Sequence, residues 1–298
     1  MNSDQLDYFL LVYNTQSIQK AAAIVPMSPQ GMAKSIKALE QELGAPLFTR
    51  EPNGKRSPTE YAQVFREFAL MSQAEMDRTL LRFVQIRARE QKTIRLASAL
   101  GLSGLFGNEC IDVFRRKRPD VAFELRETDD LTCDELVASG ACDLGLTLSP
   151  FGDGLTTIPL ASERVYAWVS TVNPLSQRTA LLPADLASTR VALFGQRQKL
   201  DASVRAAVRQ EGFELQSVTY SPEVFWHYNL ALENRAIGIT VEHLTTLPMF
   251  TDNPNVVALP IQDMNWTYGI SHEYGRVLYE HEQAFFDYAI AYARKHCA

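Results

Sequence analysis

Side chains that can donate hydrogen bonds recur at helical spacing in one short stretch of the chain, at Gln30, Lys34, Lys37 and Gln41. Amides and ammonium groups on one face of a helix suit DNA, because base edges and phosphates in the major groove accept hydrogen bonds. The same spacing also occurs on ordinary surface helices whose polar face meets water. The elements around this stretch therefore have to distinguish a DNA-reading helix from a solvated one.

The stretch is predicted to be a helix with both ends marked. Ser28 can cap the first free amides, Pro29 suits the first helical position, and Gly44 followed by Pro46 ends the helix. Apolar side chains recur on the side opposite the donors, at Met32, Ile36, Leu39 and Leu43. We expect this apolar stripe to be buried and the donors to face outward.

Two shorter helices are predicted to precede it. The first covers residues 4–14, with Ser3 available as its cap, and the second is the alanine-rich segment 17–24, which Pro26 ends. A short helix, a tight turn and a longer helix with outward donors together form a helix-turn-helix arrangement.

A β-hairpin is predicted after the donor-bearing helix. Asn53-Gly54 is a strong signal for a two-residue turn, because both central residues of that turn need a positive φ. Lys55 and Arg56 follow this turn, and Arg50 precedes it. Basic side chains on such a thin wing can reach backbone phosphate or the minor groove of DNA.

Caps, core positions and hairpin form one combined pattern, made by Leu6, Phe9, Val12, Ser17, Ile18, Ala21, Ala22, Ser28, Ile36, Leu39, Glu40, Leu43, Gly44, Pro46, Leu47, Phe48, Arg50 and Thr59. In this pattern the chain resembles the LysR-type transcriptional regulators. It departs from the family pattern at Pro29-Gln30, Ala33 and Tyr61-Ala62. These departures affect which DNA bases we expect the protein to recognise, and they do not change the predicted fold.

The resemblance implies a winged helix-turn-helix domain over residues 1–58 that binds double-stranded DNA. The DNA-binding residues expected are Ser28, Pro29, Gln30, Ala33, Lys34, Lys37, Arg50, Lys55 and Arg56. Gln30, Lys34 and Lys37 are expected in the major groove. Ser28 and Arg50 are expected on phosphate, and the last two residues of the set on the wing.

A long helix is predicted over residues 59–91. The positions Phe65, Ala69, Ser72, Met76, Thr79, Phe83 and Ile86 follow the alternating four-three spacing of a coiled-coil seam. Such a stripe needs a partner, either a second copy of the chain or the helix's own domain. In the resembled family this segment is the linker helix that pairs two subunits, so we expect a homodimer, with a homotetramer as the alternative.

From residue 92 to residue 298 predicted strands and helices alternate, which indicates parallel sheets. Strands are expected at 93–98, 121–126, 143–148, 164–170, 190–194, 216–220, 238–241, 256–259 and 267–271, and helices at 105–116, 134–139, 201–211, 225–234 and 277–294. Crossovers near residues 162 and 265 would separate lobe 1 (92–162 and 266–298) from lobe 2 (163–265).

This layout resembles the effector-binding domain of the same family, which shares its fold with type 2 periplasmic solute-binding proteins. The chain is therefore predicted to be an α+β multidomain protein with a winged helix-turn-helix, a long linker helix and a two-lobed α/β effector domain.

A small-molecule effector is expected in the cleft between the lobes, where turns at helix starts expose amides that favour an anion. The resemblance places effector contacts at these turns and at a strand end, which gives Ala99, Leu100, Gly101, Leu102, Ser103, Thr147, Gly195 and Gln196. Phe225 and Trp226 would add a flat aromatic surface. As alternatives to ligand contact, the serine and the glycines could form turns and helix caps, and the aromatic rings could pack in the core.

Composition and motifs argue against several other classes of protein. There is no GxSxG, HExxH or Walker glycine-lysine loop, so we expect neither an enzyme nor a cofactor. The four cysteines, Cys110, Cys133, Cys142 and Cys297, form no CxxC pair, which argues against zinc and favours reduced thiols. A redox switch at Cys133 and Cys142 is the alternative.

The net charge of -6 excludes a uniformly basic surface, yet bases outnumber acids between residues 20 and 56. The sequence shows no signal peptide and no apolar run of the ~20 residues that a membrane span needs, so we expect a cytoplasmic protein without membrane contact. The rival interpretation is a stand-alone small-molecule binding protein or enzyme on residues 92–298, in which the N-terminal helices only mediate association.

Overall fold

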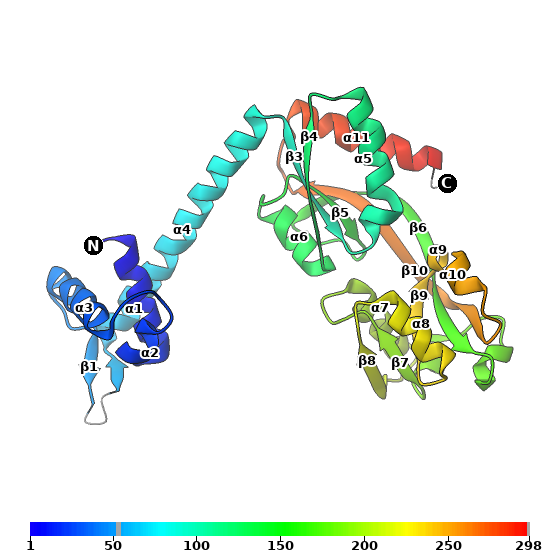
Figure 1. Ribbon diagram of the computed structural model, residues 1–298, viewed down its shortest axis with the longest axis horizontal. Coiled ribbons are helices and arrows are strands. Elements are labelled where there is room, and N and C mark those ends of the chain that lie inside the picture. The colour runs from blue at the N-terminus through cyan, green and yellow to red at the C-terminus, as the bar shows by residue number, and fades with distance from the viewer. Residues whose placement is uncertain (52–54, 297–298) are drawn as a thin grey trace. The chain divides into compact units, whose positions relative to one another are not determined.

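The computed structural model describes residues 1–51 and 55–296, and the chain divides into two compact units, Met1–Val84 and Gln85–Ala298. The first unit holds the helices α1 (Ser3–Thr15), α2 (Ile18–Ala22) and α3 (Pro29–Leu43), the strands β1 (Phe48–Arg50) and β2 (Arg56–Pro58), and most of α4 (Glu60–Glu90) (Figure 1). These elements form the predicted winged helix-turn-helix fold.

Side-chain caps start the three helices of this unit. Ser17 and Ser28 accept hydrogen bonds from backbone amides at the starts of α2 and α3, as predicted. The predicted cap of α1 is wrong, because Asn2 and not Ser3 caps this helix. Asn2 and Gln5 bind each other's backbone amides in a capping box, so two orphan donors are satisfied where a serine would satisfy one.

The core of the first unit joins one face of each helix with the wing and the start of α4. Its members are Leu6, Phe9, Leu10, Val12, Ala21, Ala22, Met32, Ile36, Leu39, Leu47, Phe48, Ala62, Phe65 and Ala69. The apolar stripe predicted for α3 is confirmed except at Leu43, which is 38% exposed. Leu43 is the last residue of α3, and Gly44 turns the chain with a φ of +66° before the side chain can reach the core.

The wing is an antiparallel pair in which Arg50 lies opposite Arg56. The turn predicted at Asn53-Gly54 lies outside the described residues. Thr59 connects the wing to α4, since its hydroxyl donates to the carbonyl of Pro46 at 2.7 Å and its backbone amide donates to the carbonyl of Leu47.

The long helix α4 confirms the predicted element to within one residue at each end. The predicted seam is wrong at its first positions, because Phe65 and Ala69 are buried in the first unit's own core. The ring of Phe65 meets that of Phe9 edge-on at 4.9 Å, so the small three-helix domain needs the start of α4 to close its core. Large apolar side chains that stay exposed on α4 are Tyr61, Val64, Phe68, Leu70, Met71, Met76, Leu80, Phe83, Val84 and Ile86.

The second unit is built on one eight-stranded sheet with the order β4-β3-β5-β10-β6-β9-β7-β8. Its strands are β3 (Thr93–Ala99), β4 (Ala122–Thr128), β5 (Leu144–Leu148), β6 (Leu155–Ser170), β7 (Arg190–Leu193), β8 (Ser217–Tyr220), β9 (Ile237–Val241) and β10 (Val256–Glu273). Its helices are a π-helical turn (Ser103–Gly107), α5 (Asn108–Lys117), α6 (Asp130–Ala138), 3₁₀ turns (Pro174–Gln177 and Pro183–Leu186), α7 (Lys199–Gln210), α8 (Val224–Leu232), α9 (Glu242–Thr245), α10 (Pro248–Thr251) and α11 (Glu280–His296).

Two lobes follow from this strand order. β3, β4 and β5 are parallel in lobe 1, and β7, β8 and β9 are parallel in lobe 2. The long strands β6 and β10 pair with each other through both lobes. Each lobe has its own apolar core, one between α5, α11 and the lobe 1 strands and the other around α7 and the lobe 2 strands (Figure 1).

The two predictions for these long strands need correction. β6 begins at Leu155 rather than at residue 164, and β10 is one strand where two were predicted. Both errors have the same cause, because the continuity comes from pairing between segments about a hundred residues apart, with register shifts between Pro260 and Asn265 and between Tyr268 and Gly269. Within the described part of the chain, no helix is long and apolar enough to span a membrane.

Candidate functional site

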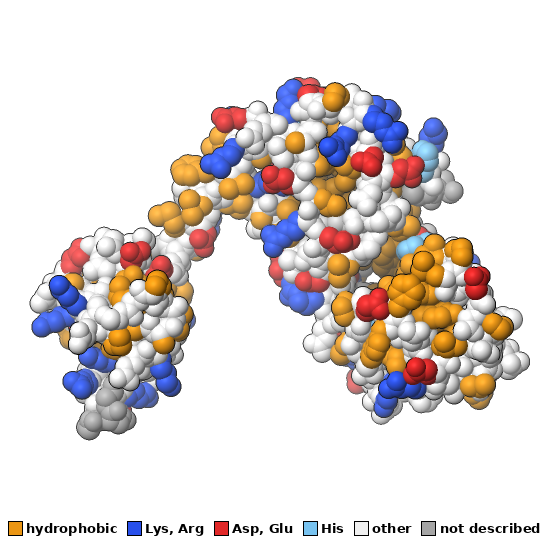
Figure 2. All heavy atoms as spheres, in the orientation of Figure 1, with side chains coloured by type: hydrophobic (Ala, Val, Ile, Leu, Met, Phe, Trp, Pro, Cys, Tyr) orange, Lys and Arg blue, Asp and Glu red, His pale blue; other side chains and the backbone are white. Residues whose placement is uncertain are grey.

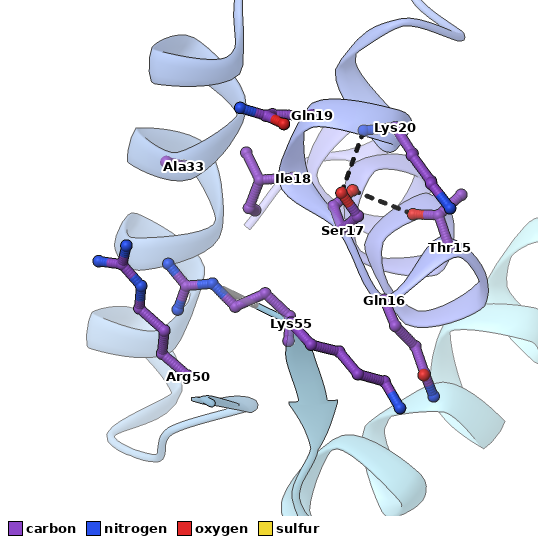
Figure 3. Close-up of a pocket in the computed structure, with 10 residues that line it drawn as sticks. Thr15, Gln16, Ser17, Ile18, Gln19, Lys20, Ala33, Arg50 and Lys55 are labelled. Atoms are coloured by element: carbon purple, nitrogen blue, oxygen red, sulfur yellow. Dashed lines mark hydrogen bonds between the residues drawn. The ribbon is translucent and has the colours of Figure 1, made fainter. Parts of the chain in front are cut away.

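A hollow of about 720 Å³ lies on the first unit between α3, the start of α2 and the wing (Figure 3). It is lined by Thr15, Gln16, Ser17, Ile18, Gln19, Lys20, Ala33, Arg50, Lys55 and Arg56. Four of these side chains are cationic and come from two elements, α2 and the wing. The hollow therefore concentrates positive charge beside α3, which is the arrangement that attracts a phosphate backbone.

The donors predicted on α3 are accessible. Gln30, Lys34 and Lys37 are exposed, and Met32 and Ile36 on the opposite face are buried. Burial of the apolar face fixes the rotation of the helix about its axis, so the polar face is held outward. α3 thus presents an amide and two ammonium groups along one exposed side.

The remaining predicted DNA-binding residues lie around this face. The hydroxyl of Ser28 accepts the amide of Gly31 at 3.1 Å, so Ser28 also caps the helix, and Pro29 is its first residue. Ala33 and Arg50 face the hollow, with Arg50 extending alongside α3 from β1 (Figure 3). Figure 2 shows lysine and arginine side chains gathered around the wing end of this unit.

The sequence reasoning missed the contribution of the turn between α1 and α2. Gln16 and Ser17 line the hollow with Gln19 and Lys20, although none of them was predicted as a site residue. The backbone amide of Arg56 donates to the carbonyl of Gln16 at 3.0 Å, which ties the wing to this turn. The local excess of bases, which includes Lys20, was the available signal.

The first predicted effector turn is occupied by a side chain of the protein itself. Glu127 at the end of β4 accepts hydrogen bonds from the hydroxyl of Ser103 at 2.6 Å and from the amide of Gly101 at 3.1 Å. Of the other residues predicted here, Ala99 and Leu102 are fully buried and belong to the lobe 1 core, whereas Leu100 is 42% exposed. The donors that were expected to bind an anion therefore already hold a carboxylate.

Thr147 on β5 is fully buried next to β10. Its hydroxyl lies 3.0 Å from the hydroxyl of Ser271, which also donates to the carbonyl of Gly145. Thr147 is therefore part of a hydroxyl network inside the sheet.

The second predicted turn lies where the lobes meet. Gly195 has a φ of +140°, which favours glycine, and Gln196 is exposed. The next residue, Arg197, donates to Asp129 and Thr132 of lobe 1 at 2.9 Å and to Glu135 at 3.0 Å.

Lys199, the first residue of α7, is buried in the same junction. Its ammonium lies 2.6 Å from the carboxylate of Asp134 and donates to the carbonyl of Leu148 at 2.6 Å. Its backbone amide donates to Asp130 at 2.7 Å. Burial raises the pKa of Asp130 to about 6, and the facing Lys199 opposes that rise.

The aromatic residues predicted to face a ligand divide between two environments. Phe225 is 48% exposed, and its ring centroid lies 5.1 Å from that of Phe250, which belongs to a buried apolar cluster of lobe 2. Trp226 neighbours His227, whose ring is buried and lies 4.3 Å from that of Phe194. Burial lowers the pKa of His227.

Three cysteines, Cys110, Cys133 and Cys142, are buried thiols, and Cys297 lies outside the described residues. Burial raises the pKa of Cys133 and of Cys142, which disfavours the reactive thiolate. In the described ranges, no group of three or more His, Cys, Asp or Glu side chains is placed to hold a metal ion.

A winged helix-turn-helix head with a basic hollow, followed by a two-lobed α/β unit, is an arrangement typical of multidomain DNA-binding regulators. Residues 87–294 match the family model described as LysR substrate binding domain, and residues 3–63 match the model of bacterial regulatory helix-turn-helix proteins of the lysR family. The chain belongs to the LysR family.

Curated relatives are similar over part of their length. The uncharacterized regulator YybE of Bacillus subtilis is 25% identical over 195 residues, which cover 65% of this chain and 66% of YybE. The regulator BenM of Acinetobacter baylyi is 28% identical over 180 residues, 59% of this chain and 58% of BenM. The chain thus spans about two thirds or less of the length of these relatives.

Solved structures share the fold. Full-length BenM has a TM-score of 0.57 and 21% identity, covering 99% of this chain and 96% of that one. The effector binding domain of QuiR in complex with shikimate has a TM-score of 0.59 and 16% identity, covering 68% of this chain and 98% of that one. CbnR in complex with its target DNA has a TM-score of 0.51 and 18% identity, covering 98% and 100%.

Proposed function

We propose that the chain is a DNA-binding transcriptional regulator that responds to a small molecule. The observation that carries the proposal is the exposed donor face of α3 next to a hollow lined by four cationic side chains. A helix with amide and ammonium donors can enter the major groove, and flanking cations bind the phosphates on either side.

In this proposal Gln30, Lys34 and Lys37 meet base edges, and Pro29 and Ala33 allow close approach on the same face. Ser28 and Arg50 bind phosphate, and Lys55 and Arg56 act from the wing. Lys20 and Gln19 extend the phosphate contacts across the hollow. Residues 1–58 are the DNA-binding domain and 59–91 the linker.

We further propose that the exposed apolar side of α4 pairs two copies of the chain. Burial of that side in a homodimer explains a row of large apolar side chains that water would otherwise meet. Two heads in one dimer imply a two-fold symmetric operator, whose half-sites are about one helical turn of DNA or a multiple apart. A homotetramer built from two such dimers is the alternative assembly.

The effector domain is assigned to residues 92–298, with the ligand between the lobes. The resemblance to a family whose domain binds small molecules supports this assignment, and so do the contacts of Arg197, which follows Gly195 and Gln196, with α6 at the lobe junction. The effector acts by binding one arrangement of the lobes more tightly than another. The structure changes one detail, because the Ser103 turn is filled by Glu127 and a ligand group there has to displace a carboxylate.

Footprinting at two salt concentrations on the DNA upstream of the chain's own reading frame tests the proposal. We expect protection of a symmetric site that weakens steeply with salt, because phosphate contacts release counterions. Changing Lys34 and Lys37 to alanine should abolish protection, whereas Arg178→Ala, a surface change in lobe 2, should leave it intact. No protection at low salt would contradict the proposal and favour a stand-alone small-molecule binding unit.

A further inference from the structure

The helix α6 contacts a different part of the second unit at each of its ends. The cap residue Asp129 and the residues Asp130 and Asp134 in its N-terminal half bind Arg197 and Lys199 of lobe 2. The chain leaves its last turn at Ser139–Gly140, where lobe 1 meets the end of α4. Nine residues at 1.5 Å each make α6 about 13 Å long, so one rigid element spans this distance.

The contact at the first turn is made largely by buried charge. The side chain of Lys199 is 5% exposed and that of Asp134 is 15% exposed, and 2.6 Å separates their charged atoms. The backbone amide of Lys199 binds Asp130, which is 2% exposed. A buried pair of this kind depends on its geometry, because moving one partner away leaves the other charge without compensation. A change in the angle between the lobes therefore has to move α6 or break this pair.

The contact at the last turn is made by a backbone carbonyl. The carbonyl of Gly140 accepts from the side-chain amide of Gln85 on α4 at 2.9 Å and from the guanidinium of Arg95 on β3 at 3.2 Å. Gly140 has a φ of +70°, a backbone conformation that favours glycine, and a Cβ there would lie 2.6 Å from the side-chain nitrogen of Gln85 and displace it. On α4, Ala88 lies one turn after Gln85 and is buried, and the helix ends two residues later.

The middle of α6 is held by close packing. Cys133 and Val137 are fully buried, each 0% exposed, and they pack in a cluster that includes Ala97 of β3. Close-packed interiors transmit strain rather than deform. A shift at the first turn of α6 is therefore passed on to Gly140.

We propose that α6 couples the arrangement of the lobes to the linker helix, with Lys199 as the positioning residue at one end and Gln85 at the other. This inference rests on the proposed function, since it assigns the route by which an effector between the lobes would reach the DNA-binding heads. Release of Lys199 from Asp134 lets α6 move, the Gly140 carbonyl leaves the Gln85 amide, and the end of α4 loosens. Coupling of this kind requires that both sites bias the same element.

Hydrogen-deuterium exchange of the full-length protein without DNA tests the coupling. Arg197→Met removes the half-exposed partner of Asp129, and Lys199→Met removes the buried ammonium while keeping the apolar stem. Both changes should accelerate exchange of the amides of residues 85–92 by roughly 3- to 10-fold, the range expected when a docking hydrogen bond is lost. Arg235→Met, which breaks an exposed pair with Glu233, is the matched control and should change nothing there.

A double variant gives the decisive comparison. In a Gln85→Ala background residues 85–92 should already exchange faster, and adding Arg197→Met should produce no further change. Acceleration confined to residues 129–135 and 195–201, with residues 85–92 as in the wild type, would overturn the proposal. Arg197 is half-exposed, so Arg197→Met is expected to fold. The comparison with Arg197→Met therefore still tests the proposal if Lys199→Met prevents folding. The exchange experiment contains no DNA, so its result does not depend on DNA binding. If the DNA-binding proposal is wrong, the footprinting experiment shows it, and the exchange result can still be interpreted.

Discussion

At the scale of single residues, the basic hollow is assembled from side chains far apart in the sequence. Lys20 belongs to α2, whereas Arg50, Lys55 and Arg56 belong to the wing. They lie together because the backbone amide of Arg56 in the wing donates a hydrogen bond to the carbonyl of Gln16, next to α2. Each cation placed on a phosphate contributes to affinity in a way that depends on salt and not on base sequence.

Lys20→Ala should weaken DNA binding about equally on specific and non-specific DNA. The slope of log K against log salt should become shallower by about 0.9, the value for one phosphate contact on duplex DNA. Fluorescence anisotropy titrations at several salt concentrations measure this slope. Arg178→Ala serves as the control, and an unchanged slope for Lys20→Ala would place this lysine outside the interface.

Asp130 should make the stability of the second unit depend on pH. Burial raises its pKa in the folded protein from an ordinary 3.8 to about 6, so folding is favoured by its protonation. The free energy of unfolding should therefore decrease as pH rises from about 4 to about 6, by up to about 3 kcal/mol for this residue. Urea unfolding across this range should show the decrease in the wild type and a flatter profile in Asp130→Asn. An equal profile in both proteins would show that other groups set the dependence.

At the scale of elements, α4 divides its apolar side chains between two tasks. Ala62, Phe65 and Ala69 close the core of the first unit, and the row that includes Met76 and Phe83 stays exposed. Heptad spacing alone could not separate these tasks, because both sets repeat with nearly the same period. Only the position of α1 against the start of α4 distinguishes them.

Replacing both Met76 and Phe83 by glutamate should dissociate the proposed dimer. Two large side chains, 53% and 58% exposed on the single chain, would be replaced by charges that repel across a pairing surface. We expect the dissociation constant measured by sedimentation equilibrium to rise roughly 30-fold or more. Val172→Glu, at a 74% exposed position in lobe 2, is the control. A double variant that sediments like the wild type would mean that the chain pairs through another surface.

At the scale of the whole molecule, the chain consists of two compact units, each with its own core. Cores that share no side chains are expected to unfold independently unless the helix between them couples them. The boundary at Val84 and Gln85 falls inside α4, so this helix is the one element that continues from one unit into the other.

Core truncations should therefore act on one unit at a time. Phe9→Ala removes a fully buried ring from the first unit and should destabilise it by about 3–5 kcal/mol. Val204→Ala removes buried methyl groups from lobe 2 and should act on the second unit. Differential scanning calorimetry should show that each variant lowers a different transition. A shift of a single shared transition by both variants would indicate one cooperative unit.

The sequence by itself determined the elements whose information is local. Ser28, Pro29 and Gly44 define α3, and the apolar period orients its donors, because caps and helical spacing depend on a few neighbouring residues. The same kind of local information, together with the resemblance to the LysR-type regulators, predicted the winged helix-turn-helix, the long helix and the two-lobed α/β unit. It also supplied the set of basic residues from which the proposed DNA interface is drawn.

Only the tertiary structure decided what depends on contacts between distant segments. The continuity of β6 and β10 comes from their pairing with each other, and the membership of Lys20 in the basic hollow comes from the wing. The occupation of the Ser103 turn by Glu127 and the burial of Lys199 between α6 and β5 are of the same kind. These contacts join residues that are from 24 positions apart, for Ser103 and Glu127, to 118 positions apart, for Leu155 and Glu273. No local period or cap can encode them, since they exist only when separate elements have packed.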